Sequence, residues 1–167
     1  SVTSEDNTVG EPIVVVKNLT KSFQHMGRTL NVLRGIDLVI ERQQLLAIVG
    51  PSGAGKSTLL HCIGTLDLPS SGSILLGNEE LTTMSSGRLA AIRNRDVGFV
   101  FQFHHLLPEF NALENAMLPG LIAGRPRKDM EARAQFLLAE VGLSARITHR
   151  PGALSGGEQQ RVAIARA

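Results

Sequence analysis

Two glycine-rich segments combine residue types that bind phosphate, and the first covers residues 50–58. It fits the pattern G-x-x-x-x-G-K-[ST], in which glycines let successive backbone N–H groups point at one anion at a helix start. We expect Lys56 to reach the β- and γ-phosphates of a nucleotide, Ser57 to offer a hydroxyl oxygen to Mg²⁺, and Thr58 to contact the α-phosphate side. The alternative is an ordinary glycine-rich turn, which has no need of Lys followed by Ser and Thr. The candidate nucleotide ligands are Gly50, Pro51, Ser52, Gly53, Ala54, Gly55, Lys56, Ser57 and Thr58.

The second segment covers residues 154–160 and repeats the same anion-binding logic. Ser155 would cap a helix that continues through Val162, Ile164 and Ala165, and the two glycines after Ser155 would expose their amides at the helix start. Taken alone, the segment also fits a capped helix with an acidic first turn. Because Ser155 follows Lys56 by 155 − 56 = 99 positions on a chain that already carries the first motif, we interpret it as a second phosphate clamp. Its candidate residues are Leu154, Ser155, Gly156, Gly157, Glu158 and Gln159.

Apolar runs predict the elements that would position both segments. Residues 45–49 form a short apolar run directly before the first motif, and residues 97–101 form another directly before Gln102. Both are predicted to be buried strands of an α/β core, where ligands bind at strand ends. Further strands are expected at 13–16, 32–40 and 73–76, and helices through 59–63 and at 85–95, 112–121 and 128–141.

Composition limits the kinds of partner. With 167 residues and 43% hydrophobic side chains, the chain can form one domain with a subdomain, and its apolar runs are shorter than the roughly 20 residues that cross a bilayer. The net charge is +2, and the arginines of the more basic second half are scattered without aromatic neighbours, so no nucleic-acid partner is expected. Cys62, the only cysteine, is expected to be a small core residue. Because His104 and His105 would point to opposite sides of an extended stretch, we expect no metal ligation there.

Together the two motifs resemble those of ABC-type ATPases, over nearly the whole chain from Ile13. The resemblance implies an α/β P-loop NTPase fold with an antiparallel β lobe and a helical subdomain. It also implies a homodimer that closes head-to-tail on ATP and Mg²⁺. By the same resemblance, Phe23 stacks on adenine where tyrosine is more usual, and Gln102 ligates Mg²⁺ together with Ser57. From the residues alone, Phe23 also fits a core side chain and Gln102 a structural glutamine at a strand end.

Residues 101–115 resemble the ATP-binding subunits of lipoprotein-releasing ABC transporters. That resemblance implies ATP hydrolysis on the cytoplasmic face of the bacterial inner membrane. It also implies integral membrane subunits that dock near the Q-loop at Gln102 and the helical subdomain, with residues 103–121 carrying partner specificity. Subunits of related exporters or of a cell-division system share the motifs and remain an alternative. ABC ATPases of DNA repair and chromosome organisation insert long coiled coils between the motifs, whereas this chain has no sustained heptads there.

The sequence divides into a flexible tail (1–11), a nucleotide-binding α/β core (12–102), a Q-loop and helical subdomain (103–153) and the signature segment with the start of its helix (154–167). The resemblance places an apolar strand ending in Asp, a catalytic Glu and a switch His after Ala167. We therefore expect the C-terminal part of the core and a complete catalytic set to be missing from these residues. Hydrolysis would then be impaired and apolar surface exposed. An ATP-binding module without hydrolysis is the alternative interpretation.

Overall fold

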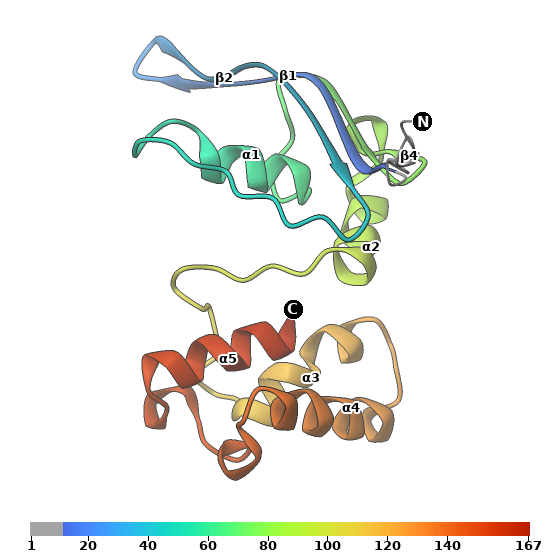
Figure 1. Cartoon of the computed structure of the whole chain (residues 1–167), viewed down its shortest axis with the longest axis vertical. Helices are drawn as coiled ribbons and strands as arrows, with labels where there is room; N and C mark the ends of the chain where they lie inside the picture. The colour runs from blue at the N-terminus through green and yellow to red at the C-terminus, as the bar shows by residue number, and fades with distance from the viewer. Residues whose placement is uncertain (1–11) are drawn as a thin grey trace, which may run out of the picture. The chain divides into compact units, whose positions relative to one another are not determined.

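The chain folds into two compact units. The computed structural model describes residues 12–167, so the tail expected at 1–11 lies outside the described residues. The first unit extends to Leu89 and the second runs from Ala90 to Ala167. Figure 1 shows a β-sheet with helices in the first unit and helices in the second. The division falls within one helix, earlier in the chain than the boundary expected after Gln102.

A four-stranded antiparallel sheet forms the first unit, in the order β2-β1-β3-β4. Its long hairpin turns at Met26 and Gly27, whose φ angles of 46° and 74° suit the tight turns that follow the twist of a hairpin. The strands expected at 13–16, 32–40 and 73–76 are therefore confirmed, each as part of a longer strand. The strands are β1 (Pro12–His25), β2 (Arg28–Glu41), β3 (Ser71–Leu76) and β4 (Glu79–Glu80).

The inner face of this sheet is packed against helix α1 (Lys56–Ile63). Val14 and Val16 of β1 are buried whereas Lys17 is exposed, which follows the period of two along a strand. Helix α1 contacts β1 and β2 and buries Leu59 and Cys62. Cys62 is thus a core residue, as expected, and burial, with Asp67 nearby, raises the pKa of its thiol. A thiol that stays protonated is a poor nucleophile, so Cys62 has a packing role.

Two segments that were expected to be strands are not strands in the structure. Residues 45–49 and 97–101 have no regular secondary structure, and Leu45 and Val49 are 99% and 87% exposed. A strand requires hydrogen bonds to a neighbouring strand, and in residues 12–167 all strand pairs lie among β1, β2, β3 and β4. An apolar run indicates that a segment would suit a buried strand, but it does not show whether a neighbouring strand is present to pair with it. Gln102 accordingly lies in a turn and not at a strand end.

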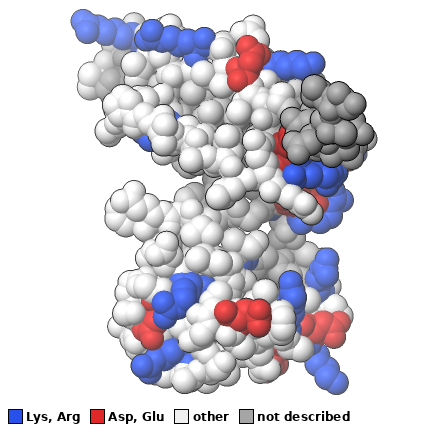
Figure 2. All heavy atoms as spheres, in the orientation of Figure 1, with Lys and Arg blue, Asp and Glu red and all other residues white. Residues whose placement is uncertain are grey.

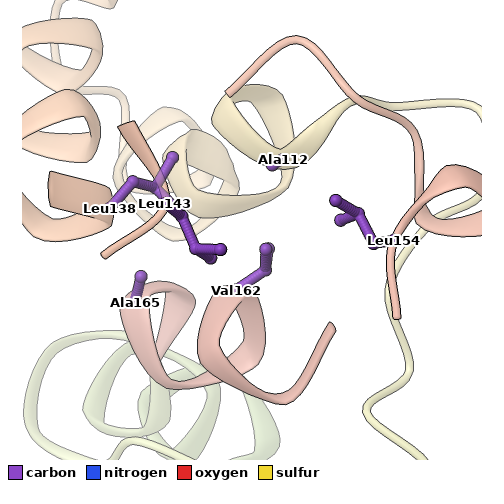
Figure 3. Packing of buried hydrophobic residues seen from close by; sticks show 6 residues of the cluster. All are labelled: Ala112, Leu138, Leu143, Leu154, Val162 and Ala165. Atoms are coloured by element: carbon purple, nitrogen blue, oxygen red, sulfur yellow. The ribbon is translucent and has the colours of Figure 1, made fainter. Parts of the chain in front are cut away.

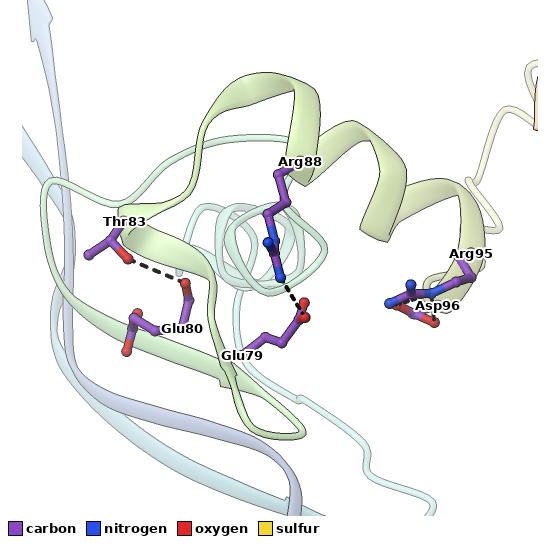
Figure 4. A network of polar contacts seen from close by, with 6 residues as sticks. All are labelled: Glu79, Glu80, Thr83, Arg88, Arg95 and Asp96. Atoms are coloured by element: carbon purple, nitrogen blue, oxygen red, sulfur yellow. Dashed lines mark hydrogen bonds and ion pairs between the residues drawn. The ribbon is translucent and has the colours of Figure 1, made fainter.

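A small polar network connects β4 to the next helix, α2 (Ser86–Asp96). The Thr83 hydroxyl donates to the Glu80 carbonyl at 3.5 Å, and Arg88 of α2 pairs with Glu79 at 2.9 Å (Figure 4). These groups are partly exposed, and such ion pairs contribute little to stability. Helix α2 begins at Ser86, close to the start expected for the helix at 85–95.

In the second unit, helices α3, α4 and α5 pack around one apolar cluster, and Figure 3 shows its side chains converging from these helices and the loops that join them. Leu154, the first residue of the signature segment, belongs to this cluster, so the helical core anchors that segment. The helices expected at 112–121 and 128–141 are confirmed to within one residue at each end. The elements are α3 (Ala112–Ile122), α4 (Arg127–Glu140), α5 (Gly156–Arg166) and the 3-10 helices η1 (Leu81–Thr83), η2 (Ser144–Arg146) and η3 (Pro151–Ala153). The cluster consists of Ala112, Leu138, Leu143, Leu154, Val162 and Ala165.

Asn115 is a fully buried polar side chain of α3 whose groups are hydrogen-bonded. Its side-chain oxygen accepts from the Leu107 N–H at 2.9 Å. Its amide nitrogen donates to the carbonyls of Leu107 and Phe110 at 3.1 Å and of Asn111 at 3.0 Å. A buried amide is costly unless it is paired, so this set of bonds holds the irregular stretch 107–110 against α3. No local pattern in the sequence singles out Asn115, because burial of one polar residue leaves no periodic signal.

Replacing Asn115 with alanine is expected to destabilise the second unit by about 3 kcal/mol, because several backbone groups lose their partners in a buried place. Denaturant unfolding monitored by circular dichroism would measure the change. The matched control is Gln135→Ala, which removes an exposed amide from α4 and is expected to change stability by less than about 0.5 kcal/mol. Equal stability of the two variants would show that the Asn115 bonds do not hold the stretch 107–110.

Candidate functional site

The first motif forms a loop that leads into helix α1, which begins at Lys56 as the P-loop pattern predicts. Gly53 and Gly55 have φ angles of 80° and 91°, in the left-handed region that glycine adopts without strain. The loop borders a hollow of about 340 Å³. The hollow is lined by Val32, Ser52, Gly53, Gly55, Lys56, Ser57 and Thr58. Most of the predicted nucleotide ligands therefore lie around one cavity.

Gly55 is required by packing as well as by its backbone angle. A Cβ atom there would lie 3.0 Å from the side chains of Leu33 and Val32 and 3.1 Å from the Val32 carbonyl oxygen. At Gly53 a Cβ atom would meet nothing within 4 Å. The loop therefore approaches β2 closely at Gly55 and leaves open space at Gly53, where backbone amides can approach a ligand.

The side chain of Lys56 folds back over its own loop. Its ammonium nitrogen donates to the carbonyl oxygens of Gly50 and Pro51, at 2.8 and 2.7 Å. An ammonium group has three N–H donors, so two hold the side chain in place and the third can reach a phosphate oxygen. The P-loop carbonyls thus orient the Lys56 side chain, which is predicted to bind phosphate together with the amides of the same loop.

The second motif forms the capped start of helix α5. The Ser155 hydroxyl accepts from the Glu158 N–H at 3.3 Å, and a Glu158 carboxylate oxygen accepts from the Ser155 N–H at 2.8 Å. This reciprocal pair is the capping box that the acidic-first-turn interpretation also requires. Gln159 donates to the carbonyls of Pro151 and Leu154, at 2.9 and 3.2 Å, which ties the helix to the loop before it. These hydrogen bonds therefore fix the conformation of the segment where it enters helix α5.

The outer side of the same helix start is open. Ser155, Gly156 and Gly157 are all exposed. A Cβ atom at Gly156 would meet nothing within 4 Å, and one at Gly157 would meet only the end of the Arg161 side chain, at 3.9 Å. Neither glycine is therefore required by the packing of this chain. Small residues at an open, positively polarised helix end suit the close approach of an anion.

The Glu158 carboxylate makes the capping box dependent on pH. Hydrogen bonds from the Ser155 N–H and hydroxyl, and then from Arg146, hold the pKa of Glu158 below its ordinary value of 4.5. A carboxyl group whose pKa is lower in the folded state stabilises that state above its ordinary pKa. This stabilisation is lost as the pH falls through the lower folded value. The start of α5 should therefore loosen in acid below pH 4.5.

We expect the difference in unfolding free energy between the parent chain and Glu158→Gln to be largest near neutral pH and to shrink steadily below pH 4.5. The reason is that protonated glutamate, like glutamine, lacks the negative charge that strengthens the hydrogen bonds from Ser155 and Arg146. Urea unfolding of both proteins from about pH 7 to about pH 3 provides the measurement. A difference that stays constant across this range would contradict the assigned cause.

Phe23 lies on β1 and is 40% exposed, so it is not a core side chain. The Lys21 ammonium lies 4.9 Å from the centre of its ring, a distance at which a cation is attracted to a ring face. Lys21 is itself held by Asp67 at 2.7 Å and by the Leu68 carbonyl at 2.6 Å. The ring is therefore accessible and held from one side, while its stacking on adenine stays a prediction. Sequence reasoning missed Lys21, because its partner Asp67 is 46 positions away.

Gln102 is exposed in a turn of the second unit, whereas Ser57 belongs to the first unit. A Mg²⁺ site that these two residues share therefore stays a prediction.

The backbone at the two neighbouring histidines differs from the extended stretch that was expected. His104 and His105 have φ angles of 31° and 48°, in the left-handed region. Their carbonyl oxygens each accept a hydrogen bond from Arg166 at 2.7 Å, and burial lowers the pKa of that guanidinium. In residues 12–167 no group of three or more His, Cys, Asp or Glu side chains could hold a metal.

The surface of the described residues is of mixed charge. On the face seen in Figure 2, Lys and Arg side chains form several small groups with Asp and Glu between them. Within the described part of the chain, none of the helices is long and apolar enough to cross a membrane.

Known proteins share both the motifs and the fold. The family model described as ABC transporter matches residues 33–167, which contain the P-loop and the signature segment, so the chain belongs to the ABC transporter family. The dimeric ATP-binding cassette MJ0796, solved in a post-hydrolysis state with ADP and Pi, matches with a TM-score of 0.86 and 38% identity. That match covers 92% of this chain and 68% of MJ0796. The fold is thus that of an ABC ATPase cassette, an α/β fold with an antiparallel sheet and helices.

Among curated relatives, the most similar proteins include two named lipoprotein-releasing system ATP-binding protein LolD. The protein of Geobacter metallireducens is 56% identical over 155 residues, which is 93% of this chain and 69% of the relative. That of Syntrophus aciditrophicus is 54% identical over 155 residues, which is 93% of this chain and 70% of the relative. The chain is therefore similar to LolD proteins along most of its own length and spans about two thirds of theirs.

Proposed function

We propose that this chain is the ATP-binding subunit of a lipoprotein-releasing transporter and works as a homodimer that binds ATP and Mg²⁺ between two copies. One observation carries the proposal. The P-loop borders an open hollow, the start of α5 in the signature segment is exposed, and the two belong to different units of one chain. Two head-to-tail copies would bring each P-loop to the signature segment of the other chain. The dimeric ADP-bound cassette MJ0796 supports this arrangement.

The chemistry proposed for the P-loop side is capture of the triphosphate. The loop amides and the Lys56 ammonium would bind the β- and γ-phosphates, and the Ser57 hydroxyl would join the Mg²⁺ shell. Phe23 would stack on adenine, and Gln102 would complete the oxygen ligands of the metal. Mg²⁺ neutralises charge on the phosphates when it is bound.

On the signature side, the proposed role is to contact the γ-phosphate of the ATP that the other copy holds. The Ser155 hydroxyl oxygen accepts a hydrogen bond from the Glu158 N–H, and rotation of the hydroxyl would let its proton turn from the Glu158 carboxylate to the phosphate. The amides of Gly156 and Gly157 would add donors at the same helix end. A nucleotide that touches both copies stabilises the pair by mass action, so ATP would close the dimer and hydrolysis would reopen it. The catalytic Asp, Glu and His expected after Ala167 stay predictions.

Docking of integral membrane subunits is proposed for the second unit, at the cytoplasmic face of the inner membrane. A hollow of about 450 Å³ there is lined by apolar side chains that include Phe101, Leu107, Leu118 and Ile122. These side chains lie in or beside residues 103–121, the stretch predicted to select the partner. The similarity to LolD proteins supports this choice of partner.

The test is reconstitution with the integral subunits of the Geobacter metallireducens lipoprotein-releasing system in vesicles that contain a lipoprotein. We expect the chain, in the intact protein, to bind these vesicles and to release lipoprotein when ATP and Mg²⁺ are added. ATP-dependent dimerisation and hydrolysis without vesicle binding would favour a related exporter or cell-division subunit. Absence of both ATP binding and dimerisation would overturn the proposal altogether.

A further inference from the structure

Arg146 lies outside both motifs, yet its side chain reaches the signature segment. Its Nε donates to one carboxylate oxygen of Glu158 at 3.1 Å, across 12 positions of sequence. The other oxygen of the same carboxylate accepts from the Ser155 N–H at 2.8 Å. Arg146 and the backbone of Ser155 therefore hold the two ends of one carboxylate group.

The backbone of Arg146 is fixed in the helical core. Its N–H donates to the Leu143 carbonyl at 2.8 Å, and its own carbonyl accepts from the His149 N–H at 2.9 Å. Leu143 is buried in the apolar cluster of the second unit, and Ile147 packs against that cluster. A second contact restricts the orientation of the guanidinium group, because its Nη1 lies 3.4 Å from Nε2 of His149. The side chain thus extends from a rigid base toward Glu158.

One contact on a glutamate leaves its orientation open. The last torsion of a glutamate side chain has a broad, roughly two-fold preference, so the Ser155 N–H alone does not fix both oxygens. The second partner on the other oxygen selects one orientation. The Arg146 side chain is 49% exposed and that of Glu158 is 19% exposed, so the pair lies at the surface and adds little to overall stability. What it determines is the geometry of the capping box.

We infer that Arg146 is a positioning residue for the signature segment. By fixing the Glu158 carboxylate it keeps Ser155 and the first amides of α5 directed at the phosphate that the other copy presents. This inference rests on the proposed function, because the phosphate in question is the γ-phosphate of ATP in the dimer. Arg146 does not touch the nucleotide and acts only through Glu158.

The test uses Arg146→Met in the intact protein, with Arg127→Met as the matched control. Arg127 is an exposed arginine at the start of α4, so the control removes the same charge far along the chain from the signature segment. We expect Arg146→Met to retain the parent affinity for ATP, measured with a fluorescent ATP analogue. Its ATP-dependent dimerisation and turnover at saturating ATP should fall about three- to five-fold, the size that one exposed ion pair can supply. The control should match the parent in every measurement.

The double variant Arg146→Met with Glu158→Gln separates positioning from general destabilisation. If Arg146 acts through Glu158, the double variant should be no worse than Glu158→Gln alone. Additive losses, or a loss of ATP affinity in Arg146→Met, would overturn the inference, as would turnover equal to that of the parent. A parent protein with no ATP-dependent dimerisation or turnover would instead contradict the proposed function.

Discussion

Replacing Lys56 with alanine is expected to weaken ATP binding by about 30-fold or more, because truncating one partner of a close charge pair costs about 2–5 kcal/mol or more. Among residues 12–167, Lys56 is the one cationic side chain that lines the P-loop hollow. In the structure its own loop already orients it, through the carbonyls of Gly50 and Pro51. Alanine would remove both the charge that is predicted to face the phosphates and the hydrogen bonds from Lys56 to the loop carbonyls. Titration with a fluorescent ATP analogue measures the affinity directly.

The control for this loss is Lys17→Ala, which removes an exposed lysine from β1 of the same unit. We expect its ATP affinity to match that of the parent. Circular dichroism of both variants would show whether the fold is kept. A Lys56→Ala protein that folds and still binds ATP with the parent affinity would overturn the assignment of the P-loop as the nucleotide site.

The local geometry of the two motif segments could be predicted from sequence because their signal is local. A P-loop requires glycines, a lysine and a hydroxyl at fixed spacing, and the structure places these residues around one hollow. A capped helix start likewise needs Ser155 and Glu158 three positions apart, and the capping box is present. Helices α3 and α4 were predictable for a similar reason, since the side chains that face the core recur with helical spacing.

What sequence could not supply is contact between distant positions. The apolar run 45–49 fits a buried strand, yet it pairs with no strand in residues 12–167 and most of its side chains are exposed. The pairs Arg146–Glu158 and Lys21–Asp67 are separated by 12 and 46 positions, and no period connects their members. The fold brings the members of such pairs together, so the pairs can be identified from the three-dimensional structure but not from the sequence.

At the signature segment, Gly157→Asp is expected to abolish ATP-driven dimerisation and to reduce turnover about 10²–10³-fold, because its carboxylate would keep the phosphate away from the helix-start amides and so cost the contact of one preorganised donor. The substitution should not harm the fold. A Cβ atom at Gly157 meets only the end of the Arg161 side chain, at 3.9 Å, and an acidic residue in the first turn of a helix is favourable. The new carboxylate would occupy the place where the phosphate of the other copy is proposed to bind, and its negative charge would repel that phosphate. Stability should therefore stay the same or rise while function is lost.

The chain offers a close control in Gly87→Asp. Gly87 is also the second residue of a helix, α2, and a Cβ atom there would meet nothing within 4 Å. Both variants should unfold at or above the parent temperature and bind ATP with the parent affinity, because the P-loop is untouched. Sedimentation velocity with ATP and Mg²⁺ should then show dimers for Gly87→Asp and monomers for Gly157→Asp. Dimers in both would mean that the start of α5 is an ordinary capped helix, because a buried phosphate contact could not tolerate a carboxylate in its place.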